Sequence, residues 1–362
     1  MTKVKLYTLI FAILLLNFAA ISVKAKTSDI PVPILLYHHI AESGGDFNEY
    51  IITPAAFREH MSVFKAVGYE CITFNDYYDY LNGIRELPPK PVIITFDDGY
   101  YSNYQYAYPI LKEFGMKATI FIVTDTVGDS ERVTYPHFTW KQAQEMEESG
   151  VIDIQSHSHS HFPLSGMDAE IVIRELTLSK YLIETNLNKE CRYFAYPNGE
   201  FDEDCQRIAE NAGYKLQCTV IPGYNTKIMP PQAQRRFMVR SDLTNADLLA
   251  LLDEFEVIIT YNGLANHNGT ISGNLNYSII NKIEIMRSAV VALAVYENNN
   301  KLVYFTSNNV TIAEYGYTGY ISNVNIPIIA ENNYTVKLFC LDSLTSMQPL
   351  GSAILQEILL CH

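Results

Sequence analysis

The chain has 362 residues, of which 48% are hydrophobic and 18% are charged, and its formal net charge is −14. This length accommodates two domains, and the composition is that of a folded protein rather than an intrinsically disordered one. The acidic balance argues against nucleic acid or an anionic membrane surface as the main partner, because both are bound through clustered Lys and Arg side chains.

The first 25 residues have the pattern of a signal peptide. Lys3 and Lys5 precede an apolar run that continues to about Val23, and Val23-Lys24-Ala25 resembles an A-x-A cleavage site. We expect cleavage after Ala25, which makes the mature protein secreted or attached at the cell surface. The alternative is an uncleaved membrane anchor, since the apolar run is nearly long enough to span a bilayer.

From Pro31 to about Arg240, short apolar runs alternate with amphipathic segments. The apolar runs predict strands over residues 33–37, 92–96, 118–123, 151–156, 193–196, 215–220 and 237–240. The amphipathic segments predict helices over residues 54–67, 102–114, 139–149, 168–186 and 203–212. Continuous apolar strands that alternate with helices indicate an α/β fold with a parallel sheet, and this number of strands predicts an incomplete (β/α)7 barrel.

The pattern changes after Asp242. Residues 243–253 predict one more helix, and the Asn- and Gly-rich stretch that follows is typical of a linker. Beyond it, apolar or alternating runs between Asn-rich turns predict a small all-β sandwich. We therefore expect a signal peptide at residues 1–25, an α/β domain at 26–260, a linker at 261–280 and a β-sandwich accessory domain at 281–362.

Two adjacent carboxylates, Asp97 and Asp98, follow the apolar run Ile93–Phe96 and precede Gly99. Residues at the C-terminal ends of parallel strands face the active site in α/β barrels. Neighbouring residues at a strand end can point in different directions, so that one Asp binds a metal ion while the other faces a substrate. Taken alone, an Asp-Asp-Gly sequence favours a turn or a helix N-cap instead.

A histidine-rich stretch, His157-Ser158-His159-Ser160-His161, follows a second predicted strand. His157 and His161 are four residues apart and can bind one metal ion if the turn between them is helix-like, whereas His159 does not fit the same face. With one Asp they form a site of two histidines and one carboxylate that leaves positions open for water and substrate. The alternative is a solvated loop that binds metal adventitiously, but the two motifs together favour a catalytic metal.

On these motifs the chain resembles the polysaccharide deacetylases with a NodB homology domain, carbohydrate esterase family four, over about residues 31–240. The resemblance implies Asp97 as general base and Ser158 as a supporting residue. It implies metal ligation by Asp98, His157 and His161. The segment Phe194–Gly199 resembles the family's third motif, which forms one wall of the substrate groove. The substrate-binding residues implied are Tyr196, Pro197, Asn198 and Gly199.

The third motif departs from the family pattern. The Arg that usually stands two residues before the Pro, and that orients the base, is replaced by Ala195. Arg236 and Arg240, near the end of the last predicted strand, are the candidates to take its place. The family's fourth motif, an Asp/Trp element, is not recognisable, and the chain's single Trp, Trp140, stands at a predicted helix start.

The family's fifth motif, L-x-H, is also displaced. It is missing after the other motifs and occurs near the N-terminus as Leu36-Tyr37-His38. This arrangement resembles a permuted subgroup of exported deacetylases that act on poly-N-acetylglucosamine. The resemblance implies His38 as the general acid, and its neighbour His39 is the alternative residue to be compared with it.

The resemblance implies a hydrolase of linear amides that removes N-acetyl groups from a GlcNAc-containing cell-surface polysaccharide, either an exopolysaccharide or peptidoglycan. The expected cofactor is a divalent metal, Zn²⁺ by default, with Co²⁺ or Ni²⁺ as alternatives. The competing functions are an O-deacetylase of the acetylxylan type and a non-catalytic glycan-binding module. The C-terminal β-domain resembles small domains of exported Gram-positive proteins, with cell-wall or glycan contact and a plain spacer as its two alternatives.

Overall fold

The computed structural model describes residues 30–42, 48–252, 255–262, 265–266, 270–281, 287–297, 301–313, 317–327, 334–341 and 354–358. The predicted signal peptide at residues 1–25 lies outside these ranges. Within them, no helix is both long enough and apolar enough to cross a membrane.

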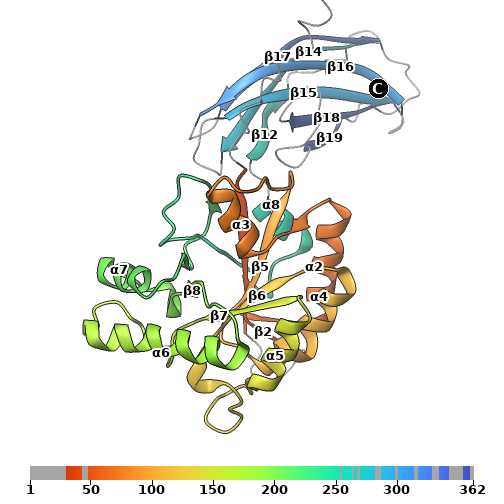
Figure 1. Ribbon diagram of the computed structural model, residues 1–362. Helices are drawn as coiled ribbons and strands as arrows, with labels where there is room; N and C mark the ends of the chain where they lie inside the picture. Colours follow the sequence, from red (N-terminus) through yellow and green to blue (C-terminus); the bar gives the residue numbers. More distant parts are fainter. Residues whose placement is uncertain are drawn as a thin grey trace, which may run out of the picture. The chain divides into compact units, whose positions relative to one another are not determined.

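A curled, open sheet forms the centre of the α/β region (Figure 1). Its strand order is β10-β1-β5-β6-β7-β8-β9, with β11 beside β1 and β4 beside β5. Within this sheet the pairings are parallel except that of β10 with β1. The strands are β1 (Val32–Tyr37), β4 (Glu70–Cys71), β5 (Pro91–Phe96), β6 (Ala118–Ile122), β7 (Ile152–Ser156), β8 (Tyr193–Ala195), β9 (Leu216–Cys218), β10 (Tyr224–Asn225) and β11 (Phe237–Met238).

Strands β1 and β5 are mostly apolar and lie inside the α/β region. Every residue of β1 and of β5 is buried, as expected for parallel strands without a solvated face. Each strand predicted between residues 33 and 240 is present, and the predicted incomplete α/β barrel is confirmed. Two further short strands, β2 (His39–Ile40) and β3 (Ile51–Ile52), pair with each other beside it.

The predicted helices are also present, and their caps follow the sequence signals. Thr53 accepts a hydrogen bond from the N–H of Ala56 at the start of α2, and Gly115 ends α4 with a left-handed φ of 69°. We did not predict α3, although a capping box of Thr73 and Asp76 begins it. The helices are α2 (Pro54–Ala66), α3 (Phe74–Leu81), α4 (Tyr108–Phe114), α5 (Trp140–Glu148), α6 (Ala169–Leu187), α7 (Glu203–Asn211) and α8 (Asn245–Leu252).

The segment 234–238 contacts both edges of the open sheet. Gln234 forms a parallel bridge with Cys218 at the end of β9, and β11 pairs in parallel with Leu35 and Leu36 of β1. Arg236 lies between these two contacts. The sheet therefore closes partly through one short segment, and Arg236 is held at the point of closure.

The C-terminal region contains two antiparallel sheets, as the predicted all-β pattern implies. One sheet consists of β12 (Phe255–Asn262), β13 (Ala265–Asn266), β14 (Thr270–Asn281) and β17 (Tyr317–Pro327). The other consists of β15 (Arg287–Glu297), β16 (Lys301–Ile312), β18 (Tyr334–Leu341) and β19 (Ile354–Ile358).

The residues of the predicted linker, 261–280, contain β13 and most of β14. Leu275, Tyr277 and Ile279 are buried in alternation with less buried neighbours, which is the period of a strand. A register shift between Gly273 and Leu275 interrupts the pairing with β17. Asn and Gly residues that suggested a linker therefore lie within a bulged strand, and the all-β region begins at Phe255.

Candidate metal centre

Asp97 and Asp98 follow the C-terminal end of β5, and a tight turn separates their carboxylates. Asp98 has a φ of 74° and Gly99 a φ of 85°, so two consecutive residues adopt the left-handed region, which is uncommon for a residue other than glycine. A Cβ atom at position 99 would lie 3.0 Å from Cγ2 of Ile122. The turn thus requires glycine after the two carboxylates, and it stores strain of the kind often found at functional sites.

The loop after β7 brings His157 and His161 together without forming a helical turn. Ser158 and His161 have φ values of 69° and 62°. The Ser158 hydroxyl oxygen accepts a 3.1 Å hydrogen bond from the N–H of His161 and so closes the turn. The predicted helix-like turn is therefore replaced by a left-handed one, while the predicted meeting of the two rings occurs, with ring centroids 4.9 Å apart.

A backbone contact orients the His157 ring. Its Nδ1 lies 2.7 Å from the carbonyl oxygen of Ala195, and because a carbonyl can only accept, Nδ1 carries the proton and Nε2 is left with its lone pair. Burial lowers the pKa of His157 and favours the neutral imidazole. His159 is turned away, with its Nδ1 2.9 Å from the hydroxyl of Thr124, as its spacing predicts.

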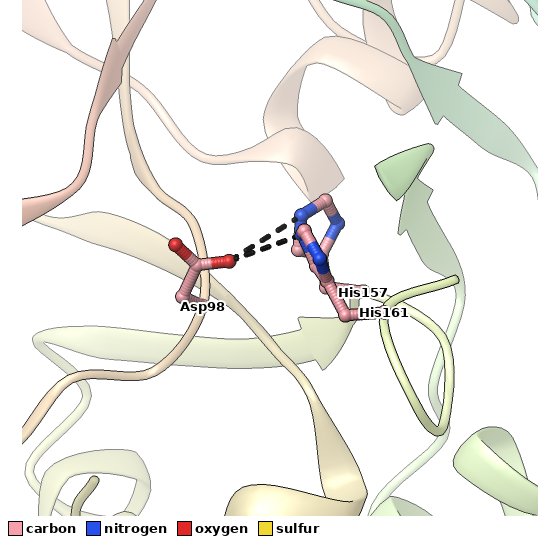
Figure 2. A group of neighbouring side chains, drawn as sticks. All are labelled: Asp98, His157 and His161. Carbon is pink, nitrogen blue, oxygen red and sulfur yellow. Dashed lines mark ion pairs between the residues drawn. The ribbon is translucent and has the colours of Figure 1, made fainter. Parts of the chain in front are cut away.

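Asp98, His157 and His161 converge on one point (Figure 2). Oδ1 of Asp98 lies 3.4 Å from Nε2 of His161 and 3.7 Å from Nε2 of His157. All three ligand atoms lie within 4.8 Å of one another. Ligands about 2.1 Å from a tetrahedral zinc ion lie roughly 3.4 Å apart. The donor set and its spacing therefore fit a divalent metal ion.

Asp97 forms a buried, bidentate ion pair with Arg236. The two terminal nitrogens of Arg236 lie 2.7 Å from Oδ1 and Oδ2 of Asp97, and the guanidinium is fully buried. Burial acts to raise the pKa of Asp97, but Arg236, together with His157 and His38, outweighs it and lowers that pKa to about 2. Asp97 is therefore ionised near neutral pH, and its Oδ2 lies 3.7 Å from Nε2 of His157.

The two arginine candidates have different surroundings. Arg236 also donates from Nε to the carbonyl oxygen of Thr219 at 2.8 Å, so its guanidinium is fixed at both ends. Arg240 is instead an exposed side chain whose Nε lies 3.1 Å from Oδ1 of Asp242. The structure thus places Arg236, and not Arg240, against Asp97.

His38 and His39 differ in how their rings are held. Nδ1 of His38 is buried and has no hydrogen-bond partner in the part of the chain that the structure describes. His39 Nδ1 lies 2.8 Å from the hydroxyl of Ser102, and its ring stacks on Tyr135 at 4.2 Å between centroids. Burial, with a smaller contribution from His137, lowers the pKa of His39 to about 4. Of these two histidines, His38 is thus the one whose Nδ1 has no hydrogen-bond partner in the described residues.

In the segment from Tyr196 to Gly199, the aromatic ring of Tyr196 is buried and the backbone around Asn198 lies at the surface. Tyr196 and Pro197 are buried, and the Tyr196 hydroxyl donates to the side chain of Gln217. The side chains of Tyr196 and Pro197 therefore lie in the core, and substrate binding by residues 196–199 stays a prediction. Asn198 is exposed with a φ of 57°, and a Cβ at Gly199 would clash with the side chain of Val220.

Backbone hydrogen bonds limit which N–H groups of this loop could face a substrate. The N–H of Tyr196 donates to the carbonyl oxygen of Cys218 at 3.0 Å, and the N–H of Gly199 donates to that of Tyr196 at 2.9 Å. Pro197 has no N–H. The N–H of Asn198 is therefore the donor that the segment offers.

Sequence reasoning missed one residue beside the histidine loop, Glu175. It lies on the buried stripe of α6 and accepts hydrogen bonds from the backbone of His159 and Ser160. A charged residue on the apolar face of a predicted helix was the available signal, because such a residue must find partners inside the fold.

Comparison with known proteins matches the central part of this chain to one family. The sequence profile of the polysaccharide deacetylases matches residues 84–217. The protein YxkH of Bacillus subtilis, whose name places it among polysaccharide deacetylases, is 32% identical over 225 residues, which are 62% of this chain and 77% of that protein. The poly-beta-1,6-N-acetyl-D-glucosamine N-deacetylase of Staphylococcus aureus is 26% identical over 201 residues, 52% of this chain and 69% of that protein.

Solved structures show the same fold. The Streptococcus pyogenes deacetylase PplD, in complex with acetate, matches with a TM-score of 0.57 and 27% identity over 62% of this chain and 99% of its own. IcaB from Ammonifex degensii matches with a TM-score of 0.56 and 25% identity over 61% of this chain and 97% of its own. His38 and Arg236 both lie outside the span that the family profile matches.

Proposed function

Because this chain belongs to the polysaccharide deacetylase family, we propose that it is a metal-dependent hydrolase that removes N-acetyl groups from a GlcNAc-containing cell-surface polysaccharide. The observation that carries the proposal is the ionised Asp97 carboxylate beside the cluster of Asp98, His157 and His161. The name of the relative from S. aureus supports the amide substrate. The predicted signal peptide supports action outside the cell.

The three ligand residues would hold a divalent cation, with Zn²⁺ the default and Co²⁺ or Ni²⁺ as alternatives. When bound there, such an ion supplies Lewis-acid chemistry, which lowers the pKa of water and polarises a carbonyl group. The neutral His157 ring with its free Nε2 is the form that a metal requires.

Asp97 has the position and charge of a general base. Its carboxylate accepts the proton of the attacking water as the water oxygen adds to the acetyl carbon. Arg236 keeps the carboxylate ionised and fixes both oxygens. The backbone N–H of Asn198 is the donor we assign to the negative charge that develops on the acetyl oxygen.

His38 completes the reaction as general acid. The carbon–nitrogen bond breaks only when the leaving nitrogen gains a proton, since an amide anion is a very poor leaving group. The imidazole of His38 donates that proton, and acetate and a free amino sugar are the products. Its Nδ1, which has no hydrogen-bond partner in the described residues, is the observation that favours His38 over His39 for this role.

Acetate release from a panel of substrates tests the proposal. The purified protein is incubated with β-1,6-linked N-acetylglucosamine oligosaccharides, chitooligosaccharides, peptidoglycan and acetylxylan. We expect release from at least one of the N-acetylated glycans and little from acetylxylan. Release from acetylxylan alone would establish an O-deacetylase instead, and release from none of them, with metal bound, would point to a glycan-binding protein.

A further inference from the structure

Helix α6 supports the loop that carries the two histidines through one buried carboxylate. Glu175 is 6% exposed. Its Oε2 accepts hydrogen bonds from the N–H groups of His159 at 3.0 Å and of Ser160 at 2.7 Å. Its Oε1 accepts a third from the Ser160 hydroxyl at 2.9 Å. All three bonds end on the residues between His157 and His161.

A second contact from the same helix holds the start of the loop. Ser179 lies one helical turn after Glu175 and so on the same face of α6. Its hydroxyl lies 2.8 Å from the hydroxyl of Ser156, the last residue of β7. His157 is thus flanked on one side by a residue bonded to Ser179 and on the other by a loop bonded to Glu175.

The loop needs such support because two of its residues adopt a sparsely populated backbone conformation. Ser158 and His161 both occupy the left-handed region, which a residue with a side chain rarely adopts without surrounding contacts. The Ser158–His161 hydrogen bond closes the turn from inside. From outside, the bonds to Glu175 fix it on the side of α6. The segment after β6 also holds it, since the N–H of Asp125 donates to the carbonyl oxygen of His159 at 2.9 Å.

Burying the carboxylate of Glu175 removes a charge from water, which costs free energy that packing alone does not require. Glu175 lies between Val172, Leu176 and Ser179 on the buried face of α6, where an apolar side chain would pack without desolvating a charge. In the described part of the chain no Lys or Arg ion pair involves Glu175. Its interactions are instead directed at the histidine loop.

We infer that Glu175 is a positioning residue that sets the separation of His157 and His161 and thereby the affinity of the centre for its metal. The inference rests on the proposed metal site and extends it to α6. Partners behind metal ligands commonly change metal affinity by about 10- to 100-fold when they are removed. Glu175 acts on the backbone of the loop rather than on a ligand ring. We therefore expect metal affinity to depend on the length of its side chain as well as on its charge.

Three substitutions of Glu175 separate the effect of side-chain length from the effect of charge. Glu175→Ala removes all three acceptors, and Glu175→Asp keeps the charge but withdraws it by one methylene. Glu175→Gln keeps the length of the side chain and one carbonyl oxygen that can accept from the N–H groups of His159 and Ser160. We expect zinc affinity to fall at least about tenfold for Ala and Asp, and only about threefold for Gln, because a neutral acceptor gives a weaker bond than a carboxylate.

Glu147, on helix α5, offers a matched control because it contacts the same strand, β7. It accepts a 2.7 Å hydrogen bond from the N–H of Ile154, in the middle of β7, and pairs with Lys189. Glu147→Ala therefore removes a partly buried carboxylate that bonds to the middle of β7, without touching the loop. We expect it to lower the melting temperature while leaving the zinc affinity of the folded protein unchanged.

The measurement is competition for Zn²⁺ between the metal-free full chain and a chromophoric chelator, with the melting temperature recorded for each variant. Wild-type protein that binds no zinc would refute the metal site itself. With zinc bound by the wild type, unchanged affinity in Glu175→Asp, or an equal loss in Glu147→Ala, would overturn the role of Glu175. If Glu175→Ala does not fold, the zinc affinities of the other two variants decide the test. Glu175→Gln should bind zinc more tightly than Glu175→Asp. Tighter binding by Glu175→Asp would overturn the inference, because it would mean that the charge of residue 175 matters and its length does not.

Discussion

Arg236 donates one 2.7 Å hydrogen bond to each carboxylate oxygen of Asp97. The two residues are far apart in sequence, and they meet because the segment 234–238 bridges β9 and β1. In this chain Ala195 stands where the resembling enzymes have an arginine. Arg236 therefore reaches the proposed base from the segment that bridges the two edges of the open sheet, and it supplies the cation that Ala195 cannot.

The first prediction concerns this pair. Arg236→Ala leaves a buried carboxylate unpaired, which typically costs about 3–5 kcal/mol of folding free energy. Arg236→Lys keeps the charge but not the planar fork, so we expect a folded protein with kcat reduced by about 10²-fold. Denaturant unfolding and acetate release measure the two effects. Arg240→Lys is the control, and an equal loss of kcat in that variant would contradict the assignment.

The second prediction concerns the stability of the fold at acid pH. His60 is 3% exposed and its Nδ1 lies 3.1 Å from the hydroxyl of Tyr37. Burial lowers the pKa of His60 from 6.5 to about 4. Above pH 6.5 the ring is neutral in both states, and burying it carries no penalty for protonation. As the pH falls from 6.5 through about 4, the unfolded state binds a proton more readily than the folded state, so the free energy of unfolding decreases.

The shift corresponds to a contribution on the order of 3 kcal/mol. His60→Gln keeps an acceptor for Tyr37 but does not titrate. We expect its free energy of unfolding to fall less than that of the wild type between pH 7 and pH 4. Parallel curves for the two proteins, measured by denaturant unfolding at each pH, would show that His60 does not titrate differently in the folded state.

The third prediction concerns the proposed acid. His38→Ala should reduce kcat on an N-acetylglucosamine oligosaccharide by about 10²- to 10⁴-fold, because the amine then leaves without a proton. An aryl acetate ester has a good leaving group and needs the acid less, so most of its hydrolysis should remain. Equal losses on both substrates would assign His38 to binding or structure. The same dependence in His39→Ala would mean that the other histidine is the acid.

The fourth prediction concerns where the catalytic unit ends. The last residues of α8 are anchored in the α/β region, since Tyr69 donates to the carbonyl oxygen of Leu252 and Tyr224 donates to that of Leu251. We expect a chain that ends at Leu252 to fold and to release acetate from a short oligosaccharide. An insoluble or inactive product would show that the all-β region is needed to complete the enzyme.

The sequence predicted the features that depend on local pattern. The apolar runs before Asp97 and His157 identified the strand ends, and the spacing of the two histidines identified the side chains that meet beside Asp98. It could not choose between Arg236 and Arg240, because the choice depends on how segment 234–238 pairs with two distant strands. Local propensity also did not reveal β14 within residues 261–280, where pairing with β17 places Asn and Gly inside a strand.

Burial was the other quantity that the sequence did not reveal. Tyr196 follows a strand in a motif that resembles a groove wall, yet its ring lies in the core and its hydroxyl bonds to Gln217. Glu175 shows the opposite case, since a charged residue on a helix is usually solvated but here lies inside the fold. Both outcomes depend on which segments pack together rather than on the residues themselves.

The most direct test measures bound metal and acetate release together in three proteins. The wild type should contain one divalent ion and release acetate from an N-acetylglucosamine oligosaccharide. Asp97→Asn should retain the ion but lose turnover, because the amide cannot accept the proton of the water. His157→Ala should lose both. Acetate release by Asp97→Asn at the wild-type rate, or full metal occupancy in His157→Ala, would contradict the account.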